Sequence, residues 1–292
     1  MRLAVFLLLG IANASAQVVV RDDYGHEVRL EKPASRIVSL APHLTEILYA
    51  AGAGERLVGG VDFSDYPAAA RALPRVGSDA RIDLEAVLAL RPDLVVAWPN
   101  AGSLRAVDRL AELGVPVFRS EPRELDDIAS TLQRLGRLAG SGRQADVAAA
   151  AFRARAAALQ RRYGAARKVR VFYQIWDRPL LTVNGAHVIS KVIGICGGEN
   201  VFADAPLLVP EVDREAVLRA NPQAIVASGS NDAQPQWLDM WRRLPGLAAA
   251  DAGQLYAIPA DLIQRHTPRI LDGAERLCTF LERAREAART RS

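Results

Sequence analysis

A fifteen-residue segment occurs twice in this chain, and it constrains the fold more than any other feature of the sequence. Residues 83–97 read DLEAVLALRPDLVVA and residues 213–227 read DREAVLRANPQAIVA, so that eight of fifteen positions are identical at a spacing of 130 residues. A repeat that occurs only twice at such a long period indicates a duplication and not a solenoid. With 292 residues, half of them apolar, the chain is long enough to form two lobes.

Each copy of the repeat has the pattern of a helix followed by a buried strand. Asp83 and Asp213 suit the N-cap of a short helix, and Pro92 or Pro222 marks its end. The apolar run that follows is typical of a parallel strand buried on both faces. Matching fragments precede the copies, with strands at 36–40 and 169–174 and helices at 45–53 and 188–196. We therefore predict an α/β fold with two Rossmann-like lobes built on parallel sheets.

A proline-free segment rich in Ala, Leu and Arg connects the two halves. Residues 124–166 carry apolar side chains at helical spacing, with one Gly-Ser-Gly break at 140–142. We expect two helices, the second of which crosses between the lobes and permits only small closure motions. The predicted domains are an N-terminal α/β lobe at 17–140, a linking helix at 141–166 and a C-terminal α/β lobe at 167–292.

The first sixteen residues have the pattern of a secretory signal peptide. Arg2 precedes an apolar run at 3–12, and the small residues at 14–16 suit a cleavage site, so we expect the mature chain to begin at Gln17. A membrane anchor is the competing interpretation, but the run is too short to span a bilayer. No cysteine follows it, which argues against a lipoprotein anchor.

Export changes what is expected of the two cysteines. In an oxidising compartment, Cys196 and Cys278 are expected to form a disulfide. The bond would close a loop of about 80 residues and stabilise the fold by roughly 4 kcal/mol in the loop-entropy model. Two buried free thiols are the alternative, and the lack of a CxxC spacing argues against a metal site.

The charge pattern does not indicate nucleic-acid binding. The net charge is +4, but basic residues alternate with acidic ones, and the Arg-rich stretch at 153–170 has the pattern of a solvated helix face. The chain also lacks a GxSxG elbow, a P-loop, an HExxH motif and a GxGxxG motif after a strand, and its four histidines are dispersed. We expect no enzymatic activity, no resident cofactor and no bound metal.

Candidate ligand-binding residues follow the predicted strands of both lobes. In open α/β sheets, ligands bind in the crevice at the carboxyl ends of the strands. The residues that this rule nominates are Pro42, His43, Phe63, Tyr66, Trp98, Trp176, Asp261, Arg265 and His266. A two-lobed exported protein with such a cleft is expected to carry a small molecule.

Five segments of the sequence resemble a known family. They are RIVSLAPHLTEILYAAGAGERLVGGVDFSDYP, VGSDARIDLEAVLALRPDLVVAW, CGGENVF, the second repeat copy and HTPRILDGAERLC. In this order they resemble the periplasmic cobalamin-binding proteins of ABC importers, within the wider class that carries siderophores, haem and corrinoids. The resemblance covers nearly the whole mature chain. It implies a class III periplasmic binding protein, periplasmic and monomeric, that carries cobalamin as its transported ligand.

The resemblance also gives a role to the repeat. In this family each lobe exposes a glutamate that docks into an arginine-lined pocket on one of two identical permease subunits, and Glu85 and Glu215 occupy the matching positions. The duplication would then supply a pair of anchors for a two-fold-symmetric permease. The alternative is that each glutamate only interacts favourably with the dipole of its own helix.

The pocket residues match the family in part. Trp98 matches directly, Phe63 takes the place of a pocket tyrosine, and Asp261 matches an aspartate of the second lobe. Two tryptophans of the family pattern are missing, since polar residues at 78–80 and aliphatic residues at 208–209 stand in their places. Trp176 is the candidate that compensates for them.

These departures keep other ligands open. A haem carrier would favour an axial His or Tyr, for which His43 is a candidate, and an anionic siderophore would favour several arginines, of which Arg265 is one. From a different class, the chain could be an extracytoplasmic enzyme or chelatase on a two-lobed scaffold. That alternative predicts titratable residues that converge in the cleft.

Overall fold

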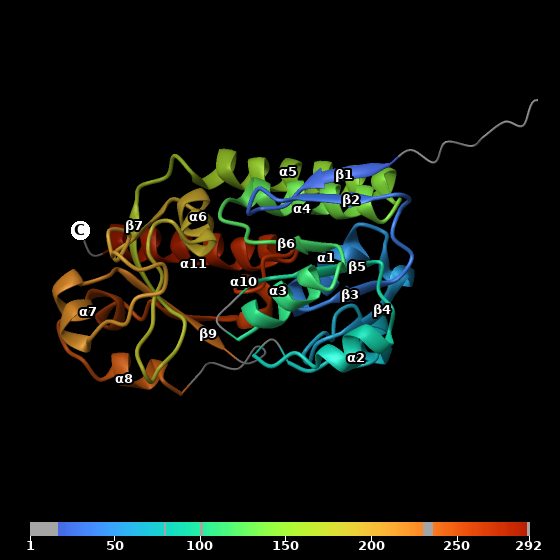
Figure 1. The fold of residues 1–292 in the computed structure, drawn as a ribbon. Helices are drawn as coiled ribbons and strands as arrows, with labels where there is room; N and C mark the ends of the chain where they lie inside the picture. The colour runs from blue at the N-terminus through green and yellow to red at the C-terminus, as the bar shows by residue number, and fades with distance from the viewer. Residues whose placement is uncertain (1–16, 79, 100–101, 230–235, 291–292) are drawn as a thin grey trace, which may run out of the picture.

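The structure is a computed structural model that describes residues 17–290 except 79, 100–101 and 230–235. The predicted signal peptide at 1–16 lies outside the described residues, as does Asp79. A two-stranded antiparallel hairpin opens the described chain, formed by β1 (Val18–Arg21) and β2 (Glu27–Leu30). The hairpin packs against α4 (Leu125–Leu138), as Figure 1 shows.

The first lobe contains a parallel sheet whose four described strands have the order β4-β3-β5-β6. The strands are β3 (Ile37–Ser39), β4 (Leu57–Gly60), β5 (Leu94–Ala97) and β6 (Val117–Arg119). The α-helices of this lobe are α1 (Pro42–Ala50), α2 (Leu84–Ala89) and α3 (Leu104–Glu112), with 3-10 turns at η1 (Gly54–Arg56) and η2 (Ala68–Ala72).

The second lobe repeats this topology. Its four described strands are also parallel and have the order β10-β9-β7-β8, which is the same order when the strands are counted along the chain of each lobe. The strands are β7 (Val169–Gln174), β8 (Gly198–Asn200), β9 (Ala224–Gly229) and β10 (Leu255–Pro259). The helices are α6 (Val188–Ile195), α7 (Arg214–Ala220), α8 (Leu238–Arg242), α9 (Ala248–Asp251), α10 (Ala260–Ile263) and α11 (Ile270–Thr290).

The repeated segment forms the same local structure in both lobes. Asp83 caps α2 by accepting a hydrogen bond from the backbone N–H of Ala86 at 3.0 Å, and Asp213 caps α7 by accepting one from Ala216 at 2.6 Å. The strands that follow, β5 and β9, are buried along their whole length. The predicted helix-strand unit and the duplicated α/β fold are therefore confirmed.

Two helices connect the lobes, as predicted. α4 ends before the Gly-Ser-Gly break, where Gly140 adopts a φ of 69°, and α5 (Gly142–Tyr163) packs against α4, α6 and α11. Figure 1 shows α4 and α5 along one face of the molecule. One continuous apolar core joins Leu48 of the first lobe, Leu135 and Phe152 of the connecting helices, and Val171 and Leu281 of the second lobe. The domain boundaries around 141–166 stay a prediction.

The predicted disulfide is present. Cys196 at the end of α6 bonds to Cys278 in α11, with a Cα–Cα distance of 4.6 Å, and both residues are fully buried. The bond fastens the edge of the second lobe to its longest helix. Among the described residues, none of the helices combines the length and the apolar character of a transmembrane span.

Candidate ligand-binding cleft

The strand order places the candidate site. In each lobe the second strand lies on one side of the first strand, and the third lies on the other side. The crevice therefore lies at the carboxyl ends of the first and third strands, which are β3 and β5 in one lobe and β7 and β9 in the other. In the first lobe this edge carries His43, at the start of α1, and Trp98, directly after β5. In the second lobe it carries Ile175 and Trp176, directly after β7. The two lobes turn these edges toward a common cleft, since Trp98 and Ile175 line one pocket.

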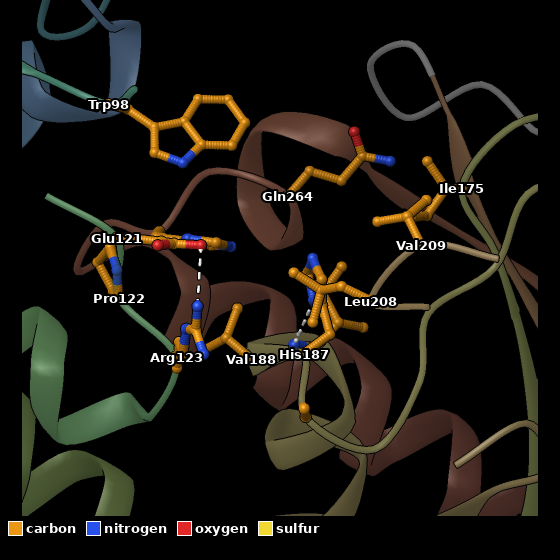
Figure 2. Close-up of a pocket in the computed structure, with 13 residues that line it drawn as sticks. Trp98, Glu121, Pro122, Arg123, Ile175, His187, Val188, Leu208, Val209 and Gln264 are labelled. Atoms are coloured by element: carbon orange, nitrogen blue, oxygen red, sulfur yellow. Dashed lines mark hydrogen bonds and ion pairs between the residues drawn. The ribbon is translucent and has the colours of Figure 1, made fainter. Parts of the chain in front are cut away.

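This interlobe pocket has a volume of about 220 Å³. Figure 2 shows Trp98 on one side of the cavity and Ile175, Leu208 and Val209 on the other. The full lining is Trp98, Glu121, Pro122, Arg123, Ile175, Ala186, His187, Val188, Ile189, Leu208, Val209, Gln264 and His266. Its walls are thus mainly apolar, and polar groups stand at a few positions.

Several lining residues were not predicted as ligand contacts. Glu121, Pro122 and Arg123 follow β6 after one intervening residue, so the crevice rule that nominates residues after other strands applies to them too. Arg123 donates to Glu121 across 3.4 Å (Figure 2). Leu208 and Val209 stand where the family pattern has a tryptophan, and the structure places both in the pocket wall.

Three histidines that are far apart in sequence meet beside this pocket. The ring centroids of His43 and His266 are 6.1 Å apart, and those of His187 and His266 are 5.6 Å apart. His43 also packs edge-on against Trp98, with centroids 5.7 Å apart. We call His43, His187 and His266 the histidine cluster. Among the described residues, no group of three or more His, Cys, Asp or Glu is arranged to hold a metal ion.

Burial keeps the histidine cluster neutral. Desolvation lowers the pKa of His43 to about 4, with a further contribution from the positive charge of Arg265. Desolvation also lowers the pKa of His187 to about 4. The pKa of His266 falls to about 3, because of desolvation and then the repulsion that protonated His43 and His187 would exert on its own positive charge.

His187 and His43 differ in their hydrogen bonding. His187 caps α6, since its Nδ1 accepts a hydrogen bond from the backbone N–H of Ile189 at 3.1 Å. The neutral ring therefore carries its proton on Nε2, which makes that nitrogen a donor. Nε2 of His43 is buried and has no hydrogen-bond partner among the described residues. His187, which lines the pocket, is thus suited to donate a hydrogen bond to a polar group of a ligand, whereas His43 does not line the pocket.

A group of charged residues joins the two lobes at another part of the cleft. Arg265 donates from Nη1 to Glu46 at 2.8 Å and to Asp65 at 2.9 Å, and its Nε lies 3.1 Å from Asp261. Arg269 donates to both carboxylate oxygens of Glu46, at 2.9 and 2.7 Å. We call these five residues the interlobe ion cluster. The Glu46 side chain is only 2% exposed, so two arginines of the second lobe hold a buried carboxylate of the first.

Two predicted ligand residues, Arg265 and Asp261, belong to the interlobe ion cluster. Arg265 and Asp261 do not line the interlobe pocket, and the guanidinium of Arg265 is occupied by three carboxylates. Burial raises the pKa of Asp65, but the hydrogen bond and charge of Arg265 outweigh it, so that the pKa lies below its ordinary value. Arg265 thus joins the lobes, and its role as a ligand contact stays a prediction.

The remaining predicted aromatic residues lie at the rim. Phe63 is 73% exposed and adopts a φ of 61°, and its carbonyl oxygen accepts a hydrogen bond from Arg265. The guanidinium of Arg269 lies 3.8 Å above the centroid of the Tyr66 ring. Pro42 is the first residue of α1 and does not line the interlobe pocket. Phe63 and Tyr66 are therefore placed beside the ion cluster and not in an enclosed pocket.

The two glutamates of the repeat are exposed. Glu85 lies in the first turn of α2 and Glu215 in the first turn of α7. Figure 1 shows these two helices far apart, at the two ends of the molecule and on the side away from α4 and α5. The pair therefore marks one side of the molecule, with one carboxylate on each lobe.

Comparisons with known proteins agree with this architecture. A vitamin B12-binding protein of Vibrio cholerae serotype O1 is 39% identical over 255 residues, which cover 87% of this chain and 91% of that relative. The crystal structure of the periplasmic vitamin B12 binding protein BtuF of Vibrio cholerae has a TM-score of 0.80 at 39% identity and covers 87% of this chain and 98% of its own.

The fold extends to carriers of another ligand class. The periplasmic heme-binding protein RhuT of Roseiflexus sp. RS-1, in its apo form, has a TM-score of 0.74 at 25% identity and covers 86% of this chain and 99% of its own. The model of the family described as periplasmic binding protein matches residues 37–262, which include most of both lobes. This chain belongs to the periplasmic binding protein family.

Proposed function

We propose that this chain is a monomeric periplasmic solute-binding protein that captures a corrinoid between its lobes and delivers it to an ABC permease. The observation that carries the proposal is the interlobe pocket, whose apolar walls come from both lobes at their topological switch points. The match to vitamin B12-binding proteins over most of the chain supports this ligand class. The function is binding and transfer, without chemical change of the ligand.

The chemistry of the pocket suits a corrinoid. A corrin macrocycle has a broad apolar face with amides at its rim, and it needs apolar walls with a few hydrogen-bonding groups. Trp98, Leu208 and Val209 supply such walls, and Arg123 and His187 supply donors near them. The macrocycle is larger than the enclosed volume of about 220 Å³. It would therefore extend into the open part of the cleft, or the lobes would part to admit it.

Two observations argue against the alternative ligands. Axial ligation of haem iron by His187 would require its Nε2 without a proton, and the hydrogen bond from Ile189 to Nδ1 opposes that tautomer. An anionic siderophore would need cationic side chains, but Arg265 and Arg269 are neutralised by the carboxylates of the interlobe ion cluster. The cluster has two arginines and three carboxylates, so it offers no excess positive charge to an anionic ligand.

The docking role of the repeat is part of this proposal. Glu85 and Glu215 are exposed, lie at equivalent positions of the two lobes and match the family pattern. Charge-assisted contacts of such a pair with arginines of a permease would fix its orientation more than they would raise its affinity. The repeat would then supply one anchor for each of two identical permease subunits.

Titration of the mature protein with cyanocobalamin, haemin and a ferric siderophore tests the proposal. We expect saturable one-to-one binding of cyanocobalamin, detected by calorimetry and by tryptophan fluorescence. Trp98→Ala should weaken it roughly tenfold or more, because the variant loses a large apolar wall. Saturable binding of haemin or the siderophore, with no binding of cyanocobalamin, would contradict the proposed ligand.

A further inference from the structure

The turn of the N-terminal hairpin contacts the loop that forms one wall of the interlobe pocket. We call residues 22–26, between β1 and β2, the hairpin turn, and residues 120–123, which follow β6, the pocket loop. Glu121, Pro122 and Arg123 of the pocket loop line the pocket (Figure 2), whereas the hairpin turn does not. A segment outside the pocket thus touches its wall.

Two aspartates of the hairpin turn make this contact. Asp23 accepts a hydrogen bond from the backbone N–H of Glu121 at 2.6 Å, although the two residues are 98 positions apart in sequence. The N–H of Asp23 donates to the carbonyl oxygen of Arg119 at 3.0 Å, and the buried carboxylate of Asp22 accepts from the N–H of Arg119 at 3.3 Å. Hydrogen bonds from backbone N–H groups to carboxylates are stronger than those between neutral groups. The hairpin turn therefore fixes the backbone of the pocket loop at Glu121.

The hairpin turn is itself held in place. The second carboxylate oxygen of Asp22 accepts from the N–H groups of Tyr24 at 2.9 Å and His26 at 2.8 Å. The second carboxylate oxygen of Asp23 accepts from Arg134 of α4 at 2.6 Å. The turn is thus anchored to a helix of the core, and such support can hold a binding group in a fixed position.

The hairpin turn also acts on the Glu121 side chain. Desolvation raises the pKa of the Tyr24 hydroxyl to about 12, and a hydrogen bond with the Glu121 carboxylate is the next cause. Tyr24 is the donor, because a carboxylate only accepts. Glu121 is therefore held at its backbone N–H by Asp23 and at its carboxylate by Tyr24.

Arg123, in contrast, is held loosely. Its side chain is 67% exposed, and it donates to the Glu121 carboxylate across 3.4 Å (Figure 2). Among the described residues, its guanidinium has no other hydrogen-bond partner. A hydrogen bond of this length is weak, so a ligand can replace it. The pocket loop thus offers a fixed acceptor beside a movable donor.

This pair suits a primary carboxamide. A carboxamide has a carbonyl oxygen that accepts hydrogen bonds and an NH2 group that donates them. Its NH2 group can donate to Glu121 while its oxygen accepts from Arg123. A carboxylate on the ligand has no proton to donate, and its charge would be repelled by Glu121. The pair therefore favours a ligand that carries amides over one that carries carboxylates.

We propose that Glu121 and Arg123 recognise a primary carboxamide of the ligand, and that the hairpin turn positions this pair through Asp23 and Tyr24. The inference rests on the proposed function, because the amides at the rim of a corrin would supply the carboxamide. Glu121 and Arg123 contact the ligand, whereas Asp23 and Tyr24 are positioning residues that do not touch it. The N-terminal hairpin is thus part of what makes the pocket selective.

The experiment compares cyanocobalamin with its monocarboxylic acids, in each of which one rim amide is replaced by a carboxylate. Calorimetry at pH 7 measures their affinities. Glu121→Gln keeps the size of the side chain and removes its charge, and Tyr24→Phe removes only the hydroxyl. Glu112→Gln and Tyr49→Phe are the matched controls, because Glu112 in α3 and Tyr49 in α1 do not line the pocket. Near-ultraviolet circular dichroism checks that each variant folds.

We expect the wild-type protein to bind at least one of the acids roughly tenfold more weakly than cyanocobalamin, because its carboxylate meets Glu121. Glu121→Gln should remove this preference. Tyr24→Phe should weaken the binding of cyanocobalamin roughly fivefold, because the Glu121 carboxylate loses a hydrogen bond that holds it.

A double-mutant cycle separates positioning from support of the fold. Tyr24→Phe combined with Glu121→Ala should bind cyanocobalamin as weakly as Glu121→Ala alone, since Tyr24 then has no carboxylate to hold. A purely structural role of Tyr24 would instead make the two losses add.

Three results would overturn the inference while cyanocobalamin still binds. They are equal or tighter binding of every acid by the wild-type protein, a preference for the amide that persists in Glu121→Gln, and additive losses in the double variant. If the wild-type protein does not bind cyanocobalamin, the proposed function itself is refuted, and the carboxamide role with it.

Discussion

The two lobes share a framework and differ in the side chains that they bring to the cleft. Both have the same strand order and the same capped helix before a buried strand. The first lobe contributes His43 and Trp98 at its switch point, whereas the second contributes Trp176 and Trp237 with a carboxylate at Asp177. Duplication therefore preserved the elements that position the lobes, while the loops after the strands carry the specificity.

The disulfide provides the largest expected difference between the lobes. It lies entirely in the second lobe, and the bonded cysteines are 82 residues apart in sequence. Replacing both cysteines with alanine should lower the free energy of unfolding by about 4 kcal/mol, because the unfolded chain gains entropy. Denaturation with urea measures this change, and dithiothreitol should affect only the wild-type protein. A loss below about 1 kcal/mol would show that packing alone holds α6 to α11.

The interlobe ion cluster tests how far the lobes depend on each other. Glu46→Gln leaves Arg265 and Arg269 without their buried carboxylate, and we expect a loss of about 3 kcal/mol in unfolding free energy. Glu55→Gln is the matched control, because Glu55 is exposed in the same lobe. Separate unfolding transitions in Glu46→Gln would show that the cluster couples the lobes. An unchanged stability would contradict the role that we assign to it.

The histidine cluster draws one ring from the first lobe and two from the second, and it predicts sensitivity to acid. The pKa values of about 4 for His43 and His187 and about 3 for His266 lie below the ordinary value of 6.5. Below about pH 6.5 the unfolded chain therefore binds more protons than the folded one, and stability falls as the pH decreases toward 4.

The variant His43→Gln measures how much of the loss of stability at low pH comes from the histidine of the first lobe. Between pH 7 and pH 5 it should lose about 2 kcal/mol less stability than the wild-type protein, since each pKa unit corresponds to about 1.4 kcal/mol. His26→Gln is the control, because His26 lies in the β1–β2 hairpin outside the cluster. Parallel stability curves for His43→Gln and the wild-type protein would contradict the prediction.

The two glutamates of the repeat give the smallest expected effects. Glu85→Arg and Glu215→Arg should each weaken permease association by roughly tenfold, and the double variant by more, with ligand affinity unchanged. Binding to the permease in nanodiscs and calorimetry with the ligand measure these two quantities. Equal effects in the single variants would indicate that the lobes dock equivalently. Loss of ligand binding with unchanged permease association would refute the assignment.

Local patterns made the framework predictable from the sequence. A helix cap, a buried strand and a terminating proline lie within each fifteen-residue copy, so Asp83 and Asp213 could be placed without knowledge of the rest of the fold. The pairing of Cys196 with Cys278 followed from export and from the number of cysteines. Trp98 and Trp176 could be placed at the cleft because they directly follow strands of the two sheets, and their role in ligand binding stays a prediction.

The contacts that cross the cleft could not be predicted in the same way. His43 and His266 come from different lobes, and their proximity depends on how the lobes pack. The same packing places Glu46 between two arginines, so that Arg265, a predicted ligand contact, also joins the lobes. Propensities and spacing describe single elements, whereas these contacts depend on the relative placement of both sheets.

The apolar core that runs through α4 and α5 into both lobes couples ligand binding in the cleft to the stability of the whole chain. Since apolar residues of both lobes and the connecting helices form one continuous cluster, we expect thermal unfolding to be cooperative. A ligand present at a hundred times its dissociation constant would add about 2.7 kcal/mol to that single transition. The melting temperature of the native protein can thus be used to screen candidate solutes before the identity of the cargo is known.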